Sequence, residues 1–330
     1  MLIFYLVEFT PLYSHYPQEH VVKHLSVETA NNIIELIKDV SRQVGTLYIK
    51  WFGGEPLLQY KMIQYLMIKA EPICKENNCK FRMFITTNGY LIDKEKIIEM
   101  KKYGLQGMQV TIDGSRTVHN LTRTLCNGEG TYDRILENMI LALENGIHIV
   151  LRINIPEKMK ESECEILNGI PEKYRKLVTV DFCNVFQNEK KISTFLFMKR
   201  AIEMGFGYSG RRNSYNGCDA GGSNSLYIDT NGDILLCSNV QKGEKNIGTL
   251  GLNGKVEYKN MGLLYEFKTI SARDNEQCKN CIELPFCIGA CKYARLKNNN
   301  ECIGIQNDAL TLEERACLDY YYDRKLENAV

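Results

Sequence analysis

Apolar and polar positions alternate with two different periods along the first two-thirds of the chain. Runs with the period of a β-strand lie at residues 2–9, 46–52, 81–87, 107–113, 147–155 and 179–186. Amphipathic stretches with the period of a helix lie at residues 26–42, 58–76, 93–103, 130–145, 160–173 and 191–204. Ser26, Asp93 and Thr131 stand where helix N-caps are expected.

This alternation predicts parallel strands joined by right-handed crossover helices. Six strand–helix units indicate an α/β fold, a partial (β/α)6 barrel of the TIM type, and an open doubly wound sheet is the alternative. Either architecture places its functional residues at the carboxyl ends of the strands.

The pattern changes at about residue 205, where a segment rich in Gly, Ser and Asn begins. A hairpin follows at 225–237, with Asn231-Gly232 suited to a type I′ turn. A cysteine-rich segment and a charged helix from residue 312 complete the chain. We therefore expect a barrel domain at 1–204 and a small domain at 205–330 that needs metal to fold.

Composition narrows the class of protein. The formal net charge of +1 gives no reason to expect nucleic acid or a membrane surface as partner. The opening MLIFYLVEF is short, lacks a basic flank and is typical of a strand rather than of a signal peptide. The chain starts almost on this strand, without an N-terminal extension, and we expect it to be cytoplasmic. Its 13 cysteines therefore indicate metal ligation rather than a disulfide framework.

Polar residues stand where four of the predicted strands end. They are Gly53, Gly54 and Glu55 in WFGGEPLL, Asn88 in TTNG, Thr111 and Asp113 in QVTIDGSR with Arg123 downstream, and Asn154 in LRINIP. Each motif alone is equally typical of a loop or a turn. Polar side chains inside an apolar strand, such as Asn154, need partners and indicate a polar interior or a ligand.

Cysteines cluster in the last third of the chain. Cys278, Cys281, Cys287 and Cys291 have the spacing C-x2-C-x5-C-x3-C, and Cys218, Cys237, Cys302 and Cys317 flank them. Four thiolates hold either zinc or an iron–sulfur cluster. The number of cysteines and the lack of histidine among them favour iron–sulfur.

In this order and on these elements, the motifs resemble radical S-adenosylmethionine (radical SAM) enzymes of the SPASM subgroup, over about residues 25 to 305. The resemblance implies that Gly53, Gly54 and Glu55 contact the amino group of the cofactor's methionine moiety. It places Thr111 and Asp113 near the ribose and adds Asn88 and Asn154 to the cofactor site. Arg123 serves either the methionine carboxylate or a structural ion pair.

The same resemblance implies two auxiliary [4Fe–4S] clusters. Cys278, Cys281 and Cys287 hold one together with Cys302, for which Cys317 is the substitute. Cys218, Cys237 and Cys291 hold the other, which has an open iron site.

One family motif is missing. The catalytic cluster of radical SAM enzymes is held by CxxxCxxC after the first strand, where this chain has EFTPLYSHYPQEH. The three family positions fall at Glu8, Leu12 and His15, and no cysteine occurs before Cys74. A truncated or altered start, a degenerate paralogue and a true variant all predict this pattern.

The resemblance implies a maturase that modifies a side chain of a ribosomally made peptide or protein by 5′-deoxyadenosyl radical chemistry, with flavodoxin or ferredoxin as electron donor. A sulfatase-maturing enzyme is the alternative, although Ser238 replaces the family's aspartate base. A non-catalytic iron–sulfur scaffold is the competing class, and the missing motif favours it. A zinc domain on a sugar- or phosphate-handling barrel is a more distant alternative.

Overall fold

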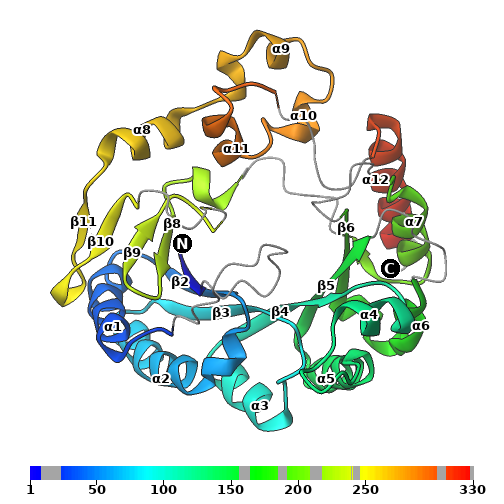
Figure 1. Cartoon of the computed structure of the whole chain (residues 1–330), viewed down its shortest axis with the longest axis horizontal. Coiled ribbons are helices and arrows are strands. Elements are labelled where there is room, and N and C mark those ends of the chain that lie inside the picture. Colours follow the sequence, from blue (N-terminus) through cyan, green and yellow to red (C-terminus); the bar gives the residue numbers. More distant parts are fainter. Residues whose placement is uncertain are drawn as a thin grey trace. The chain divides into compact units, whose positions relative to one another are not determined.

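The computed structural model describes residues 1–8, 24–155, 164–184, 192–208, 218–238, 240, 246–302 and 310–327. Strands and helices alternate along the first two-thirds, as predicted (Figure 1). The chain forms two compact units: the first contains 1–87, 98–106 and 215–303, and the second contains 88–97, 107–214 and 304–330. Each unit thus gathers segments that are distant in sequence. The domain boundary expected after residue 204 stays a prediction.

The sheet of the first unit joins the start of the chain to its cysteine-rich part. Its strands are β1 (Leu2–Glu8), β2 (Thr46–Gly53), β3 (Lys80–Thr87), β8 (Ser225–Asp229), β9 (Asp233–Leu235), β10 (Gly248–Leu250) and β11 (Val256–Tyr258). They lie in the order β11-β10-β9-β8-β1-β2-β3. β1 pairs in parallel with both β2 and β8, whereas β8 to β11 pair antiparallel. The first strand is therefore a central one in this unit.

Helices cover one face of these strands and leave polar side chains on the other. The helices of this unit are α1 (Val27–Ser41), α2 (Tyr60–Glu76), α8 (Met261–Thr269), α9 (Glu276–Lys279), α10 (Leu284–Cys287) and α11 (Lys292–Lys297). In β2, Leu47, Ile49 and Trp51 are buried, while Tyr48 and Lys50 on the opposite face are half-buried. This alternation is that of a sheet with one apolar and one partly polar face.

The second unit repeats the pattern. Its parallel strands are β4 (Leu105–Ile112), β5 (His148–Ile155), β6 (Val178–Asn184) and β7 (Gly207–Tyr208). Its helices are α4 (Arg116–Thr122), α5 (Tyr132–Glu144), α6 (Glu165–Gly169), α7 (Phe195–Glu203) and α12 (Leu312–Glu327), and α3 (Lys94–Lys102) contributes residues to both units. In β5, Leu151 and Ile153 are buried, whereas Arg152 and Asn154 are half-buried. The predicted α/β class is confirmed.

Two predicted caps form and one does not. The Ser26 hydroxyl accepts a hydrogen bond from Thr29 N at 3.0 Å, and Asp93 Oδ1 accepts one from Lys96 N at 2.8 Å. Thr131 precedes α5 but makes no capping bond, so this prediction is wrong. Its hydroxyl instead donates to the Arg123 carbonyl at 2.8 Å, because α4 brings that carbonyl within reach.

Two further predictions need correction. The helix expected at 160–173 is the short α6 followed by a 3-10 turn at Glu172–Leu177, because Pro171 cannot continue a helix; residues 156–163 lie outside the described ranges. The hairpin turn is not type I′, since only Gly232 has a positive φ, of 86°. Asp229 Oδ1 accepts from Asn231 N and Asp233 N at 2.8 and 2.9 Å and thereby fixes a three-residue turn.

Throughout the described ranges, none of the helices is long and apolar enough to cross a bilayer.

Candidate active site and metal centres

Glu55 is a buried carboxylate at the carboxyl end of β2. It is only 2% exposed and precedes a 3-10 turn, Pro56–Gln59. Its Oε1 accepts hydrogen bonds from Leu57 N at 3.1 Å and from the Thr87 hydroxyl, at the end of β3, at 2.7 Å. These two hydrogen bonds fix the position of the carboxylate. Asn88 follows Thr87 directly, and its Oδ1 accepts from Tyr90 N at 2.8 Å in a turn.

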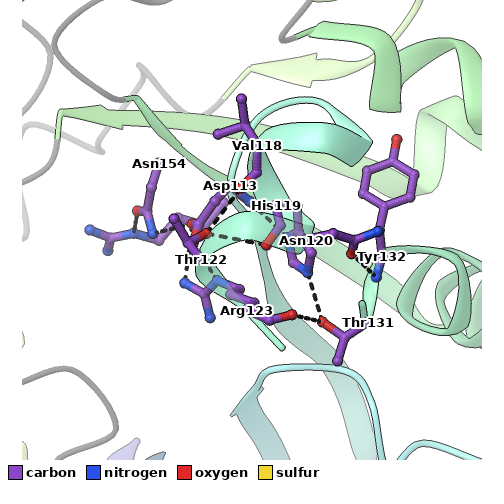
Figure 2. Close-up of polar contacts among 10 residues, drawn as sticks. Asp113, Val118, His119, Asn120, Thr122, Arg123, Thr131, Tyr132 and Asn154 are labelled. Carbon is purple, nitrogen blue, oxygen red and sulfur yellow. Dashed lines mark hydrogen bonds and ion pairs between the residues drawn. The ribbon is translucent and has the colours of Figure 1, made fainter. Parts of the chain in front are cut away.

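Three of the predicted site residues in the second unit contact one another (Figure 2). Arg123 donates from Nε to Asp113 Oδ2 at 2.5 Å and from Nη2 to Asp113 Oδ1 at 3.1 Å. Asn154, from β5, donates to Asp113 Oδ1 at 2.8 Å. The Arg123 and Asp113 side chains are only 10% and 15% exposed. Two roles were expected for Arg123, and this geometry corresponds to the structural ion pair.

Thr111 lies on β4 two residues before Asp113 and is half-buried. Its register partner on β5 is Arg152, whose Nε donates to Asn154 Oδ1 at 3.2 Å. The half-buried face of β4 and β5 therefore carries hydroxyl, guanidinium and amide groups beside the Asp113–Arg123 pair. Such groups bind the hydroxyls of a sugar or the backbone of a peptide.

His119 supports this network through hydrogen bonds, a role that the sequence did not predict. It is fully buried, and its Nδ1 accepts a hydrogen bond from Asp113 N at 3.2 Å. Its Nε2 lies 3.0 Å from the Thr131 hydroxyl, which donates onward to the Arg123 carbonyl. Burial, with the Arg123 charge, lowers the pKa of His119 from 6.5 to about 4 against the opposing effect of Asp113. The imidazole is therefore neutral, with Nδ1 as acceptor and Nε2 as donor.

We call Cys278, Cys281, Cys287 and Cys302 the first cysteine group. Burial raises the pKa of the Cys287 thiol, and the charges of Cys302 and Cys278 act in the same direction. Cys287, Cys278 and Cys302 therefore lie near one another. After Cys287 the backbone is left-handed at three consecutive residues, Ile288, Gly289 and Ala290, with φ of 49°, 83° and 57°. Such conformations are costly outside glycine and mark turns that their surroundings enforce, often at functional sites.

We call Cys218, Cys237 and Cys291 the second cysteine group. Tyr227 of β8 lies beside two of them: burial raises its pKa, and the charges of Cys218 and Cys237 add to that effect. The Tyr227 ring stacks on Tyr5 of β1, with ring centroids 4.2 Å apart. Cys291 begins α11 at the end of the left-handed turn.

Polar side chains of β1 and β2 hold the residue that follows Cys218. Asp219, the residue after Cys218, accepts hydrogen bonds from the Tyr5 hydroxyl and, at 3.0 Å, from Lys50 Nζ. These two donors and the Lys50 charge lower the pKa of Asp219 despite its burial, which acts in the opposite direction. The second cysteine group is therefore tied to β1 and β2 through side chains as well as through the sheet.

Cys317 and Cys302 belong to different units. Cys317 is in α12, where its charge acts on Lys199 of α7. Cys302 lies with Cys287 in the first unit. In the part of the chain that the structure describes, no three Cys, His, Asp or Glu side chains lie close enough together to hold a metal ion.

The segment after β1 does not supply the expected catalytic ligands. Leu12 and His15 lie outside the described ranges, as does the side chain of Glu8, the last residue of β1. No cysteine precedes Cys74 in the sequence, and Cys74 is fully buried in α2. The residues present therefore do not fit a three-thiolate cluster at this position.

Part of the sequence matches known proteins. Residues 13–168 match the family model of the Radical SAM superfamily. A stretch of 120 residues is 30% identical to Fe-coproporphyrin III synthase of Methanosarcina barkeri (strain Fusaro / DSM 804) and covers 36% of this chain and 27% of that protein. The chain therefore matches little more than a quarter of this curated relative.

Solved structures extend the likeness to the whole fold. The structure of native anSMEcpe with bound AdoMet superposes with a TM-score of 0.65 at 16% identity, over 99% of both chains. Streptococcus suis SuiB bound to precursor peptide SuiA superposes with a TM-score of 0.58 at 19% identity, over 90% of this chain and 72% of that one. The predicted fold class, a partial (β/α)6 barrel with a cysteine-rich part, is confirmed. Residues 13–168 therefore contain a region that matches the Radical SAM superfamily, and the fold of the chain is similar to that of the two solved structures.

Proposed function

We propose that this protein is a SPASM-type radical SAM maturase by descent, which acts on a side chain of a ribosomally made peptide or protein. One observation carries the proposal: the residues that the family resemblance nominates follow or end parallel strands, Glu55 after β2, Asp113 after β4 and Asn154 in β5. Carboxyl ends of parallel strands are where such folds bind their ligands.

S-adenosylmethionine is the proposed cofactor. Glu55, with Gly53 and Gly54, would receive the ammonium of its methionine moiety, because Glu55 places a buried carboxylate at the carboxyl end of β2 and a carboxylate forms a charge-assisted hydrogen bond with an ammonium. Thr111 and Asp113 would meet the ribose hydroxyls. Arg123 would orient Asp113 rather than bind the methionine carboxylate, since both of its contacts to Asp113 are already made.

The C-terminal cysteines are proposed to hold two auxiliary [4Fe–4S] clusters. The first cysteine group would bind one, with Cys302 as the ligand rather than Cys317, because Cys302 lies near Cys287 whereas Cys317 is in α12, near Lys199. The second cysteine group would bind the other. Bound clusters supply electron transfer or a site for a substrate thiolate.

A peptide substrate is supported by SuiB, whose solved structure contains its precursor peptide. The half-buried polar face of β4 and β5 offers amide and guanidinium donors to such a backbone. We further propose a cytoplasmic location, with a flavodoxin or a ferredoxin as electron donor.

The same observations define two rival functions. A sulfatase-maturing enzyme is weakened by Ser238, which follows Cys237 where those relatives have an aspartate base. A non-catalytic iron–sulfur scaffold is supported by the lack of cysteine before Cys74. Because of this lack, the residues present give no basis for a radical step at a catalytic cluster.

Anaerobic reconstitution of the full chain with iron and sulfide, followed by iron counting and an assay for 5′-deoxyadenosine under strong reductant, separates these functions. About eight irons per chain without 5′-deoxyadenosine would establish two clusters on a scaffold and reject the maturase. About twelve irons with cofactor cleavage would establish the radical enzyme. Iron-free protein that tightly retains zinc would reject both.

A further inference from the structure

Arg295 is the largest fully buried side chain in the described part of the chain. It is 1% exposed and lies in α11, where its backbone N donates to the Cys291 carbonyl at 3.0 Å. A guanidinium remains protonated in proteins, so its burial costs free energy unless acceptors and opposite charge compensate. Its surroundings must therefore explain the charge.

Each nitrogen of this guanidinium has a partner near a cysteine of the first group. Nε donates to the Gly289 carbonyl, and Nη1 donates to Asn300 O and Oδ1 at 3.2 and 3.0 Å. Nη2 donates to Cys278 Sγ at 3.0 Å. Within the described residues these acceptors are carbonyls, an amide oxygen and a sulfur, and none is a carboxylate. The sulfur is thus the acceptor that can carry a full negative charge.

The same contacts fix three loop segments that carry cysteines. Gly289 lies in the left-handed turn that follows Cys287, and Asn300 stands two residues before Cys302. Asn275 links the two ends, because its Nδ2 donates to Asn300 O at 2.9 Å and its Oδ1 accepts from Cys278 N at 3.0 Å. One buried cation therefore sits at the centre of the segments that carry the cysteines.

Thiolates that bind iron are anionic, and reduction of an iron–sulfur cluster adds one further negative charge. A fixed cation in a low-dielectric site stabilises that charge more strongly than a cation in water would. Contacts outside the ligands tune metal sites in this way, and hydrogen bonds to sulfur and net charge set the reduction potentials of clusters.

We propose that Arg295 is the buried counter-cation of the first cysteine group, where it positions the ligand segments and raises the reduction potential of an iron–sulfur cluster bound there. The inference rests on the proposed function, because it requires a cluster at these cysteines. It assigns Arg295 a positioning and electrostatic role and no contact with substrate.

The test uses the full-length chain with Cys218→Ser and Cys237→Ser, which leaves the first cysteine group as the one cluster site. In this background we compare Arg295→Gln, Arg295→Lys and Asn300→Ala with Arg273→Gln, which removes an exposed arginine from the neighbouring turn as a matched control. Iron and sulfide content report assembly. A redox titration followed by electron paramagnetic resonance gives the midpoint potential of whatever fraction assembles.

Arg295→Gln is expected to shift the midpoint to lower potential, and Arg295→Lys, which retains the charge, to stay closer to the parent. Asn300→Ala, which removes an acceptor but not the cation, is expected to lower iron content without that shift. Unchanged potential in Arg295→Gln, equal shifts in the Gln and Lys variants, or an equal shift in Asn300→Ala would overturn the inference. A parent that binds no iron would instead reject the proposed function.

Discussion

The neutral state of His119 makes a pH-dependent contribution to stability that can be isolated by one substitution. In the folded chain its Nδ1 accepts from Asp113 N, so protonation at Nδ1 would place two N–H donors against each other in a fully buried site. His119→Gln retains an acceptor and a donor at similar positions but does not titrate. The free-energy difference between the two chains should therefore depend on pH.

The magnitude follows from the pKa of His119, which burial and the Arg123 charge lower from 6.5 to about 4. Since each pKa unit corresponds to about 1.4 kcal/mol, the neutral imidazole contributes about 3 kcal/mol. As pH falls, His119 takes up its proton in the unfolded chain before it does so in the folded chain. The full contribution to the free energy of unfolding is therefore present above the unfolded pKa of 6.5. It is lost as pH falls from about 6.5 towards 4.

Urea unfolding followed by circular dichroism would be measured for both chains between pH 7.5 and 4. Titrating carboxylates and His148, whose pKa burial also lowers, are present in both chains and cancel in the difference. The free energy of unfolding of the parent should fall relative to His119→Gln by about 3 kcal/mol over this range. A pH-independent difference, or a His119 resonance by NMR (the one lost in His119→Gln) that titrates near 6.5, would refute the reasoning.

Two further results are expected from simpler measurements. Cys302→Ser should lose about four irons per reconstituted chain, whereas Cys317→Ser should keep the parental content; the opposite pattern, by iron analysis, would make Cys317 the ligand. Gly104 and Gly232 have positive φ of 98° and 86°, but a Cβ at Gly104 would lie 2.6 Å from the Phe81 carbonyl oxygen and one at Gly232 no closer than 3.5 Å to any neighbour. Gly104→Ala should therefore lower the free energy of unfolding by about 3 kcal/mol or more, and Gly232→Ala by about 1 kcal/mol. Urea unfolding followed by Trp51 fluorescence measures both losses. Equal losses would show that the backbone moves to relieve the contact between the new Cβ at residue 104 and the Phe81 carbonyl.

The regular elements were predictable because their periods are strong. β2 and β5 alternate buried and half-buried side chains along their length, and this period-two signal is visible in the sequence. The turn at residues 229–233 was not, since the Asn-Gly pair favours type I′ until the Asp229 carboxylate captures two backbone N–H groups. Thr131 failed as a cap for a similar reason: its hydroxyl donates to the carbonyl of Arg123, eight residues earlier in the sequence, which the fold brings within hydrogen-bond distance.

The candidate site was predictable in its members but not in their pairing. Strand ends nominate Asp113 and Asn154, but only the fold brings Arg123 from the end of α4 onto the same carboxylate. The roles of His119 and Arg295 could not be predicted, because a single buried polar residue in a helix leaves no periodic signal in the sequence. Arg295, four residues after Cys291, is typical in sequence of an exposed cation in a charged segment.

The central place of β1 in its sheet has a consequence for synthesis. Tyr5 pairs with Tyr227, so one edge of the first strand has no partner until β8 has left the ribosome. At translation rates of about 5–20 residues per second, that wait lasts roughly 10 to 45 seconds. An unpaired apolar edge is a template for association with other chains. During that interval the edge of β1 is open to association with other chains, and rare codons between β3 and β8 would prolong the exposure.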